Sequence, residues 1–279
     1  KQTFIKVYAL DDFTASTDFC DVRLSNEFRA YVDPSNKANL YHISVNVDGL
    51  KANLDFDGCL EGCKPIGAEV KAEKGNKEGT FFWAIPLPKA KVMGEFSIGT
   101  RKYAIRKGLG YHDHNYWKVD CRHKLFMDDV ISKWYWGRCF AEDYTIIFMD
   151  TYCHDEQIKA LFVANRHNII HCSNSSIEVS VSDFKKDGQL NTSYPARVTI
   201  KSIIENEPFQ MILRSKELTD RRDLLEDINP IARWLIRFFV SKPSYFGLLA
   251  DGTMKLANNE INGTALYEMI YFRNHHAKE

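Results

Sequence analysis

The chain has 279 residues, enough for one large β domain or two of ordinary size. Its 37 basic and 37 acidic side chains give a formal net charge of zero. A protein that binds phosphate backbones usually has a basic excess, so we expect no nucleic-acid partner. With 18 Phe and 13 Tyr the sequence is rich in aromatic residues, which fill β cores and also line pockets for flat apolar ligands.

Apolar and polar residues alternate with a period of two along much of the chain. Residues 43–47 and 50–57 alternate on either side of Asp48-Gly49, a pair typical of a type I′ hairpin. Such a hairpin fixes one apolar and one polar face over its two strands. Further strands are expected near residues 3–10, 27–33, 80–85, 91–98, 101–107, 143–150, 158–165, 176–182, 195–204, 208–215, 244–256 and 264–273.

Many antiparallel strands without intervening amphipathic helices indicate an all-β protein. We predict two β-barrel or sandwich halves of similar size with one or two short helices. The helices are expected at residues 124–132 and at 229–239, where Asn229-Pro230 is typical of a helix start. The predicted boundary near Ala141–Glu142 gives an N-terminal domain 1–141 and a C-terminal domain 142–279.

Seven cysteines are scattered along the chain, and the C-x₃-C pair Cys59 and Cys63 has the spacing of neither a redox motif nor a structural zinc site. This pattern indicates a reducing compartment, and we predict a cytoplasmic location. The N-x-S/T sequons at Asn174, Asn191 and Asn262 leave secretion as the alternative. No apolar run approaches the length of a transmembrane helix, so no membrane span is expected, and no signal peptide is evident.

Four motifs follow one another in the chain. They are Trp83-Ala-Ile-Pro-Leu-Pro-Lys-Ala-Lys-Val-Met-Gly94, Gly108-Leu-Gly-Tyr-His-Asp-His-Asn115, Trp136-Gly-Arg138 and Gly263-Thr-Ala-Leu-Tyr-Glu268. This ordered set resembles the family that contains carotenoid 1,2-hydratase (hydroxyneurosporene synthase), the AttH-like proteins and the lipocalin-like Diels–Alderases. The resemblance spans roughly residues 80 to 272. It implies that both halves are lipocalin-like and that a hydrophobic small molecule is held in a cavity without any cofactor.

The chain departs from this family pattern at two places. The family places Trp-Gly after the second motif, whereas here Tyr116 and Trp117 follow Asn115. In the hydratases a later Tyr-x-Asp is implied to serve catalysis, together with the Trp whose position Tyr116 occupies here. The counterpart of Tyr-x-Asp is Phe148-Met-Asp150, which keeps the carboxyl and loses the phenol. The resemblance therefore predicts the scaffold and does not by itself predict hydration.

Polar residues of the second motif suggest a chemistry. On a strand, His112 and His114 face one side, and Tyr111, Asp113 and Asn115 face the other. Polar groups delivered into an apolar interior need partners, either one another or a ligand. A carboxyl in such a site has a raised pKa and can protonate an alkene, while aromatic faces stabilise the resulting carbocation. The same cavity could instead orient a polyene for cycloaddition.

We therefore expect a cofactor-independent cyclase or hydratase that acts on an apolar polyene or isoprenoid-like substrate. His114 and Asp113 are predicted to form the acid–base or hydrogen-bonding pair, with His112 beside them and Asp150 as a second acid. The predicted substrate-binding residues are Tyr111, Asn115, Tyr116, Trp117, Trp136, Phe148 and Trp83.

Other interpretations stay open. The protein could be a carrier that binds an isoprenoid or lipid and leaves it unchanged, or the polar string could be a structural plug without chemistry. His112-x-His114 with Cys121-x-His123 could supply metal ligands, but the Glu that cupins add is absent and we expect no metal. Transient contact with a membrane during substrate uptake is compatible with each interpretation, and the oligomeric state is left open.

Overall fold

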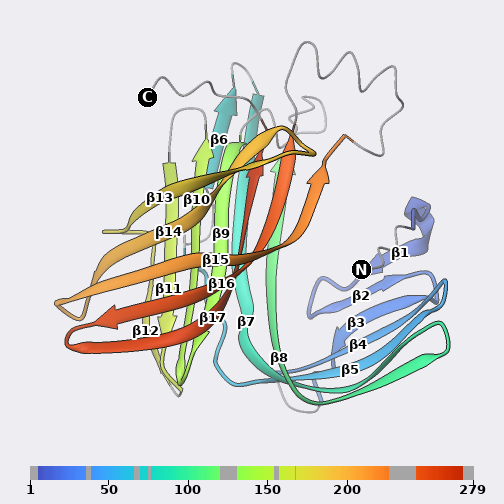
Figure 1. Ribbon diagram of the computed structural model, residues 1–279. Helices are drawn as coiled ribbons and strands as arrows, with labels where there is room; N and C mark the ends of the chain where they lie inside the picture. Colours follow the sequence, from blue (N-terminus) through green and yellow to red (C-terminus); the bar gives the residue numbers. More distant parts are fainter. Residues whose placement is uncertain are drawn as a thin grey trace. The chain divides into compact units, whose positions relative to one another are not determined.

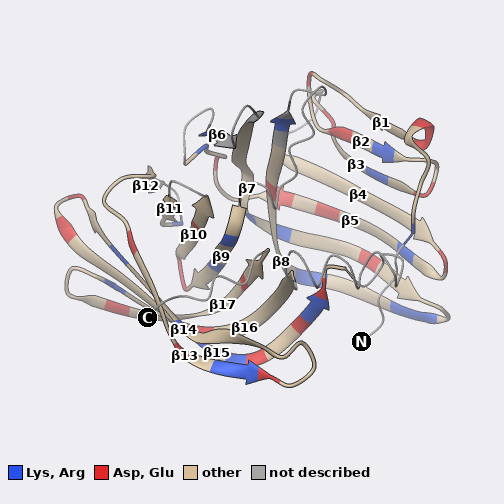
Figure 2. Ribbon diagram, turned by 90° about the horizontal axis from the view of Figure 1, so that it is seen from above, with Lys and Arg blue, Asp and Glu red and all other residues tan. Residues whose placement is uncertain are grey.

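The computed structural model describes residues 6–35, 39–65, 70–74, 77–119, 131–153, 157–166, 168–225 and 243–272. These residues form one 3-10 turn, η1 (Leu10–Asp12), and strands in two antiparallel sheets (Figure 1). The all-β class predicted from the alternation is confirmed. Acidic and basic residues are interspersed along both sheets (Figure 2). Within the described ranges no helix is long and apolar enough to cross a membrane.

The first sheet has the order β1-β2-β3-β4-β5-β7-β6, and β8 pairs with β7. At the predicted hairpin Val47 pairs with Leu50, and Asp48 and Gly49 have φ angles of 37° and 84°, as a type I′ turn requires. The strands are β1 (Phe13–Ala15), β2 (Asp21–Leu24), β3 (Phe28–Val32), β4 (Leu40–Val47), β5 (Leu50–Gly58), β6 (Val70–Lys74), β7 (Lys77–Ile98) and β8 (Arg101–Val119).

Strand β7 changes its partner along its length. It pairs with β6 as far as Phe81 and with β5 from Ala90 onward. Pro86 and Pro88 fall between these two ladders, so their missing backbone N–H groups interrupt neither of them, and β8 also pairs with β7. The segments 80–85 and 91–98, predicted as separate strands, therefore form one strand.

The second sheet has the order β12-β11-β10-β9-β17-β16-β15-β14-β13. Side chains from both ends of this order share one hydrophobic core, including Leu161 of β11 and Val198 of β14, so the sheet curves around a single interior (Figure 1). Its strands are β9 (Ile131–Ala141), β10 (Tyr144–Cys153), β11 (Gln157–Ala164), β12 (Ile169–Ser173), β13 (Glu178–Asp187), β14 (Thr192–Ile204), β15 (Glu207–Asp223), β16 (Ser244–Leu256) and β17 (Asn259–Tyr271).

The chain divides into two compact units. Residues 1–62 and 85–113 form the first, and residues 63–84 and 114–279 form the second. Strand β7 therefore enters the first unit at Ile85, and β8 leaves it after Asp113. The predicted domains 1–141 and 142–279 stay a prediction, and β9, which precedes their boundary, pairs with β10 and β17 in the second sheet.

Some local predictions differ from the structure. Residues 6–9 lie outside any strand, and Leu10–Asp12 form the 3-10 turn, in which Asp12 Oδ2 accepts a hydrogen bond from the Ala9 amide at 3.2 Å. A strand expected near 3–10 is therefore wrong over this stretch. The helices predicted at 124–132 and 229–239 lie outside the described residues, except that residues 131 and 132 begin β9 rather than end a helix.

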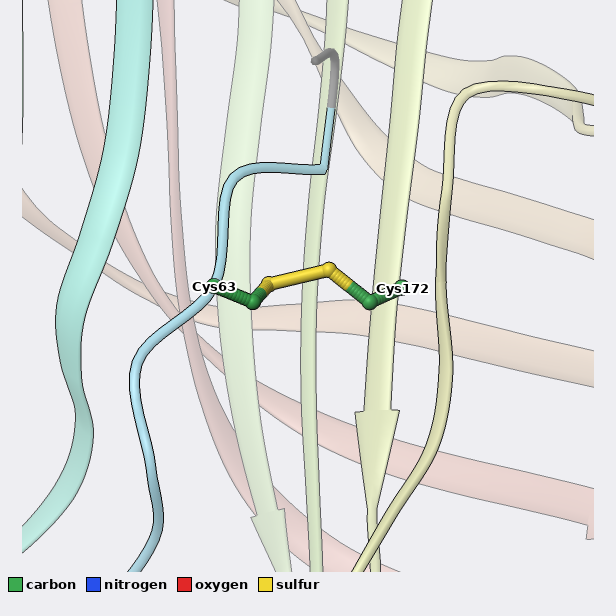
Figure 3. Close-up of a disulfide and its surroundings, with 2 residues drawn as sticks. All are labelled: Cys63 and Cys172. Atoms are coloured by element: carbon green, nitrogen blue, oxygen red, sulfur yellow. A yellow bond between two sulfur atoms is a disulfide. The ribbon is translucent and has the colours of Figure 1, made fainter. Parts of the chain in front are cut away.

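A disulfide joins Cys63 to Cys172 within the second unit (Figure 3). Cys172 lies in β12, an edge strand of the second sheet, and Cys63 precedes β6. The bond links positions 109 residues apart and ties the Cys63 segment to that edge. Disulfides are typical of oxidising compartments, so this bond counts against the reducing compartment that the cysteine pattern predicts.

Gly137 of the Trp-Gly-Arg motif is a packing position in β9. A Cβ atom there would lie 2.6 Å from Phe148 Cε1 and 2.7 Å from Tyr267 Cβ, closer than real contacts allow. The absence of a side chain thus lets two large aromatic residues close over the strand.

We expect Gly137→Ala to lower the free energy of unfolding by about 1–3 kcal/mol, because it overpacks this core. Urea denaturation followed by circular dichroism measures the change. Gly188→Ala is the control, because a Cβ atom there meets nothing within 4 Å. If Gly137→Ala unfolds at the same urea concentration as the parent protein, the packing explanation is wrong.

Candidate functional site

Two neighbouring rows of polar side chains cross the inner face of the second sheet. The cross-strand register places Lys133 opposite Tyr152, and Tyr135 opposite Asp150. The next row along the strands is apolar and contains Phe148 opposite Gly137. We call the residues of the two polar rows the polar cluster: Lys133 and Tyr135 of β9, Asp150 and Tyr152 of β10, Gln157 and Lys159 of β11, and Tyr271 of β17.

Asp150 is fully buried, with 1% of its surface exposed. Its Oδ1 accepts a hydrogen bond from Gln157 Nε2 at 2.7 Å, whereas none of the described residues donates a hydrogen bond of ordinary geometry to its Oδ2. Burial raises the pKa of the carboxyl. This effect outweighs the Gln157 hydrogen bond, the charge of Lys159, the interaction with the Tyr152 hydroxyl and the charge of Lys133, which all lower it. Asp150 therefore keeps its proton to a higher pH than an ordinary aspartate.

Two phenols lie beside this carboxyl. The rings of Tyr135 and Tyr152 meet edge to face with centroids 6.2 Å apart, and the hydroxyls of Tyr135 and Tyr271 lie 3.2 Å apart. Burial, followed by the Asp150 charge, raises the pKa of Tyr152 to about 12. Burial also raises the pKa of Tyr135. Both phenols thus stay protonated and can donate hydrogen bonds at neutral pH.

These phenols were not among the predicted site residues. The family pattern places a phenol two positions before the carboxyl, at Phe148, whereas the structure has one two positions after it, at Tyr152. Residues 148, 150 and 152 share a face because side chains alternate along a strand. The signal for Tyr152 was therefore present in the same alternation, while Tyr135 is brought to Asp150 only by the pairing of β9 with β10.

Lys133 places a cation in this cluster. Its Nζ lies 4.0 Å from the centroid of the Tyr152 ring and 5.7 Å from that of Tyr135. Burial lowers the pKa of the amine, although the charge of Asp150 acts in the opposite direction. Among the described residues no carboxylate forms an ion pair with Lys133.

The second sequence motif lies on β8, and its first part belongs to the first unit. A Cβ atom on Gly110 would collide with the Phe56 ring and approach Val92 Cγ2 to 2.6 Å. The His112 ring meets the edge of Tyr41 with centroids 5.3 Å apart. This part of β8 therefore packs closely on Phe56 and Val92, and His112 extends the contact to Tyr41.

The end of the motif belongs to the second unit. The His114 ring contacts Tyr116 edge to face at 5.1 Å, and Tyr116 stacks on Phe82 at 4.3 Å. His114, Asn115 and Tyr116 are exposed, while Asp113 is half-buried, as are Tyr111 and His112. The catalytic pairing of His114 with Asp113 stays a prediction.

The remaining predicted residues are spread over β7 to β10. Trp83 is buried in β7, and Phe148 lies in the core row next to Asp150. Trp136 is half-buried and points away from the face that carries Tyr135. The side chain of Trp117 lies outside the described part of the structure.

The metal interpretation gains no support from the parts of the chain that the structure describes. Within them, no three His, Cys, Asp or Glu side chains are grouped so that they could hold a metal ion. Cys121 and His123 lie outside the described ranges.

Asp187 is a second buried carboxyl, with an opposite environment. It accepts hydrogen bonds from the amides of Gln189 and Leu190 at 3.0 and 2.7 Å and from Arg221 Nη1 at 2.8 Å. Burial alone would raise its pKa, but the hydrogen bonds from Leu190 and Arg221 outweigh burial and lower it. Asp187 is thus a satisfied structural carboxylate, and Asp150 is not.

Comparison with known proteins begins with the sequence, which no family model matches. Hydroxyneurosporene dehydrogenase from Chlorobaculum tepidum is 29% identical over 112 residues, which cover 37% of this chain and 28% of that protein. The match thus spans little more than a quarter of the relative's length.

Solved structures resemble the chain over most of its length. CghA bound to Sch210972 has a TM-score of 0.63 and 11% identity, over 95% of this chain and 74% of that one. Kievitone hydratase from Nectria haematococca has a TM-score of 0.57 and 13% identity, over 91% of this chain and 71% of that one. A putative AttH from Nitrosomonas europaea has a TM-score of 0.60 and 10% identity, over 91% of this chain and 70% of that one.

At these identities the structural likeness establishes the fold. The chain has the all-β fold of the AttH-like, lipocalin-like proteins, with two antiparallel sheets. The family resemblance indicated by the four motifs is confirmed at this level by the curated relative and by the solved structures.

We expect Asp150→Asn and Asp187→Asn to change the pH dependence of stability in opposite directions. The raised pKa of Asp150 makes the folded protein bind a proton more tightly than the unfolded chain does, so the Asp150 contribution to stability falls as pH rises from the ordinary carboxyl pKa to the raised one. The lowered pKa of Asp187 makes its contribution rise with pH, and it is lost as pH falls through the lowered value.

The measurement is urea denaturation of the parent protein and both variants at a series of pH values between about 3 and 8. The stability of the parent minus that of Asp150→Asn should decrease with pH, and the corresponding difference for Asp187→Asn should increase. Parallel curves for the parent and Asp150→Asn would show that burial does not perturb the Asp150 carboxyl.

Proposed function

We propose that the protein is a cofactor-independent hydratase or cyclase that acts on an apolar polyene or isoprenoid-like substrate, with the polar cluster as its acid centre. The observation that carries this proposal is the buried Asp150 carboxyl, whose Oδ2 receives no hydrogen bond of ordinary geometry from the described residues. A buried polar oxygen without a partner costs free energy, and carboxyls with a raised pKa gather at functional sites. Asp187 shows how a structural carboxylate in the same unit is satisfied.

In the hydration reaction, protonated Asp150 gives its proton to an alkene carbon. The alkene π electrons form the new C–H bond, the O–H bonding electrons stay on the carboxylate, and the neighbouring carbon becomes a carbocation. The faces of Tyr135 and Tyr152 stabilise this cation. Water adds to it and returns one proton to Asp150, so the net change is the addition of water.

In the cyclisation reaction, a second double bond of the substrate attacks the carbocation in place of water. A C–C bond closes the ring and the positive charge moves to the other carbon of the second double bond. A neighbouring C–H then loses its proton to Asp150, its electrons form a new C=C bond, and the acid is restored. The same residues thus serve either outcome, and access of water to the cation decides between them.

The relatives and the second motif support a reaction of this kind. One structural neighbour is named a hydratase, and the curated relative is named for hydroxyneurosporene. We also propose, from the second motif alone, that His114 and Asp113 act as a catalytic pair with His112 and that the predicted aromatic residues bind substrate. The cytoplasmic location stays a prediction, against which the disulfide of Cys63 counts.

A carrier that binds an apolar ligand and leaves it unchanged is the second candidate. The exposed positions of His114 and Tyr116 favour it, because catalytic groups usually act out of water. A carrier tolerates loss of the polar residues, whereas an enzyme does not.

We expect Asp150→Asn to lower turnover by about 10²–10⁴-fold, because the amide cannot act as a general acid. The assay incubates the protein with neurosporene in detergent micelles and detects hydrated or cyclised product by mass spectrometry. The parental rate should also fall as pH rises through the raised pKa of Asp150. Asp187→Asn, checked for folding by circular dichroism, is the control and should keep the parental rate; equal rates for the two variants contradict the assignment.

We expect His114→Ala to abolish turnover, because the ring is proposed as an acid–base or hydrogen-bonding group, and to leave the fold intact, because the ring is exposed and its described contact is with Tyr116. The same assay and a thermal melt measure the two effects, and stability should change by no more than about 0.5 kcal/mol. If the variant converts substrate at the parental rate, His114 is not catalytic. If the parent protein releases neurosporene unchanged, the carrier function is favoured.

A further inference from the structure

We propose that the polar cluster binds a carboxylate, so that the ligand of this protein is an apolar chain that ends in a carboxylic acid. The inference rests on the proposed function for its site and deepens it by naming the polar end of the substrate. It is argued from the side chains that the register of β9, β10, β11 and β17 brings together.

Hydrogen-bond donors dominate the polar cluster. Lys133 and Lys159 carry ammonium groups, the three tyrosines carry hydroxyls, and Gln157 carries an amide NH₂. In the parts of these two rows that lie on β9, β10, β11 and β17, Asp150 is the acidic residue. Burial keeps its carboxyl protonated to a higher pH than usual. Donors in excess around one point suit an anionic oxygen ligand.

Lys133 is the residue of the polar cluster that most favours an anionic ligand. The amine is half-buried with its Nζ over the Tyr152 ring, and no described carboxylate forms an ion pair with it. When the row of Lys133 is followed across β17 and β16, the first acidic residue in it is Asp223 of β15, three strands from β9. A buried charge without a counter-ion is costly, and a ligand carboxylate would remove that cost.

The rows next to the polar cluster are apolar. Beyond Tyr135 and Asp150 the inner face continues with Gly137, Phe148 and Leu161, which are all buried. Along the strands the inner face thus changes from hydrogen-bond donors to apolar side chains. An amphiphilic ligand has a matching polar end and apolar chain. Gln157 already donates to Asp150, and the hydroxyls of Tyr135 and Tyr271 lie 3.2 Å apart, so Lys133 is the donor that a ligand carboxylate would satisfy.

The test compares cis-parinaric acid, a fluorescent conjugated polyene with a terminal carboxylate, with its methyl ester. The two probes share one chain and differ in the charge and hydrogen-bonding capacity of the end group. Fluorescence titration of the intact protein should give a Kd for the acid at least about tenfold lower than that for the ester.

Variants of Lys133 locate the effect. Lys133→Met should weaken binding of the acid by about tenfold and leave binding of the ester unchanged, whereas Lys133→Arg should keep the preference for the acid. Lys201→Met is the matched control, because Lys201 is exposed on β14 and lies 4.0 Å from Glu178. It should bind both probes as the parent does.

Equal affinity of the parent protein for the acid and the ester overturns the proposal, as does an acid affinity that Lys133→Met leaves unchanged. Failure of the proposed function is seen separately, because the titration requires no turnover. A protein that prefers the acid through Lys133 but forms no product is a carboxylate carrier, and there the inference stands while the enzymatic function fails.

Discussion

Cross-strand register in the second sheet decides which side chains meet in its interior. Strand β10 presents Phe148, Asp150 and Tyr152 on one face, and pairing with β9 brings Lys133 and Tyr135 beside them. A shift of one residue would turn Asp150 to the opposite face and put Met149 or Thr151 in its place. The chemistry of the site therefore depends on the hydrophobic alternation that holds this register, because the same core residues that stabilise the sheet also aim the carboxyl inward.

Sequence patterns predicted features that depend on neighbouring residues in the chain. They missed contacts that arise only when two strands pair. The Asp48-Gly49 hairpin followed from two adjacent residues, and the all-β class followed from alternation within single strands. Asp150 was also singled out from the sequence, but the phenol opposite it, Tyr135, lies on another strand and meets it only through the β9–β10 register. The strands predicted at 80–85 and 91–98 are one strand, and Pro86 and Pro88 fall between the part of it that pairs with β6 and the part that pairs with β5.

The glycines of the family motifs act mainly in packing. Gly94 has a φ of 135°, and a Cβ atom there would collide with the carbonyl oxygen of Asn53. Gly263 would place a Cβ atom 2.5 Å from the carbonyl oxygen of Phe140, and Gly110 and Gly137 are equally crowded. Motifs built on such positions specify how closely strands and side chains approach. They consequently identify the scaffold well and say little about the reaction, which is decided by side chains such as Tyr152 that no motif contains.

Asp150 and Lys133 share one desolvated environment, and that environment links ligand binding to acid strength. Burial raises the pKa of the carboxyl and lowers that of the amine, so it favours the neutral form of each. In the proposed complex a ligand carboxylate near Lys133 favours the charged form of the amine. The negative charge of the ligand raises the pKa of Asp150 and the positive charge of Lys133 lowers it, so the two charges oppose each other at the acid. Burial therefore remains the main cause that keeps Asp150 protonated when the alkene lies beside it.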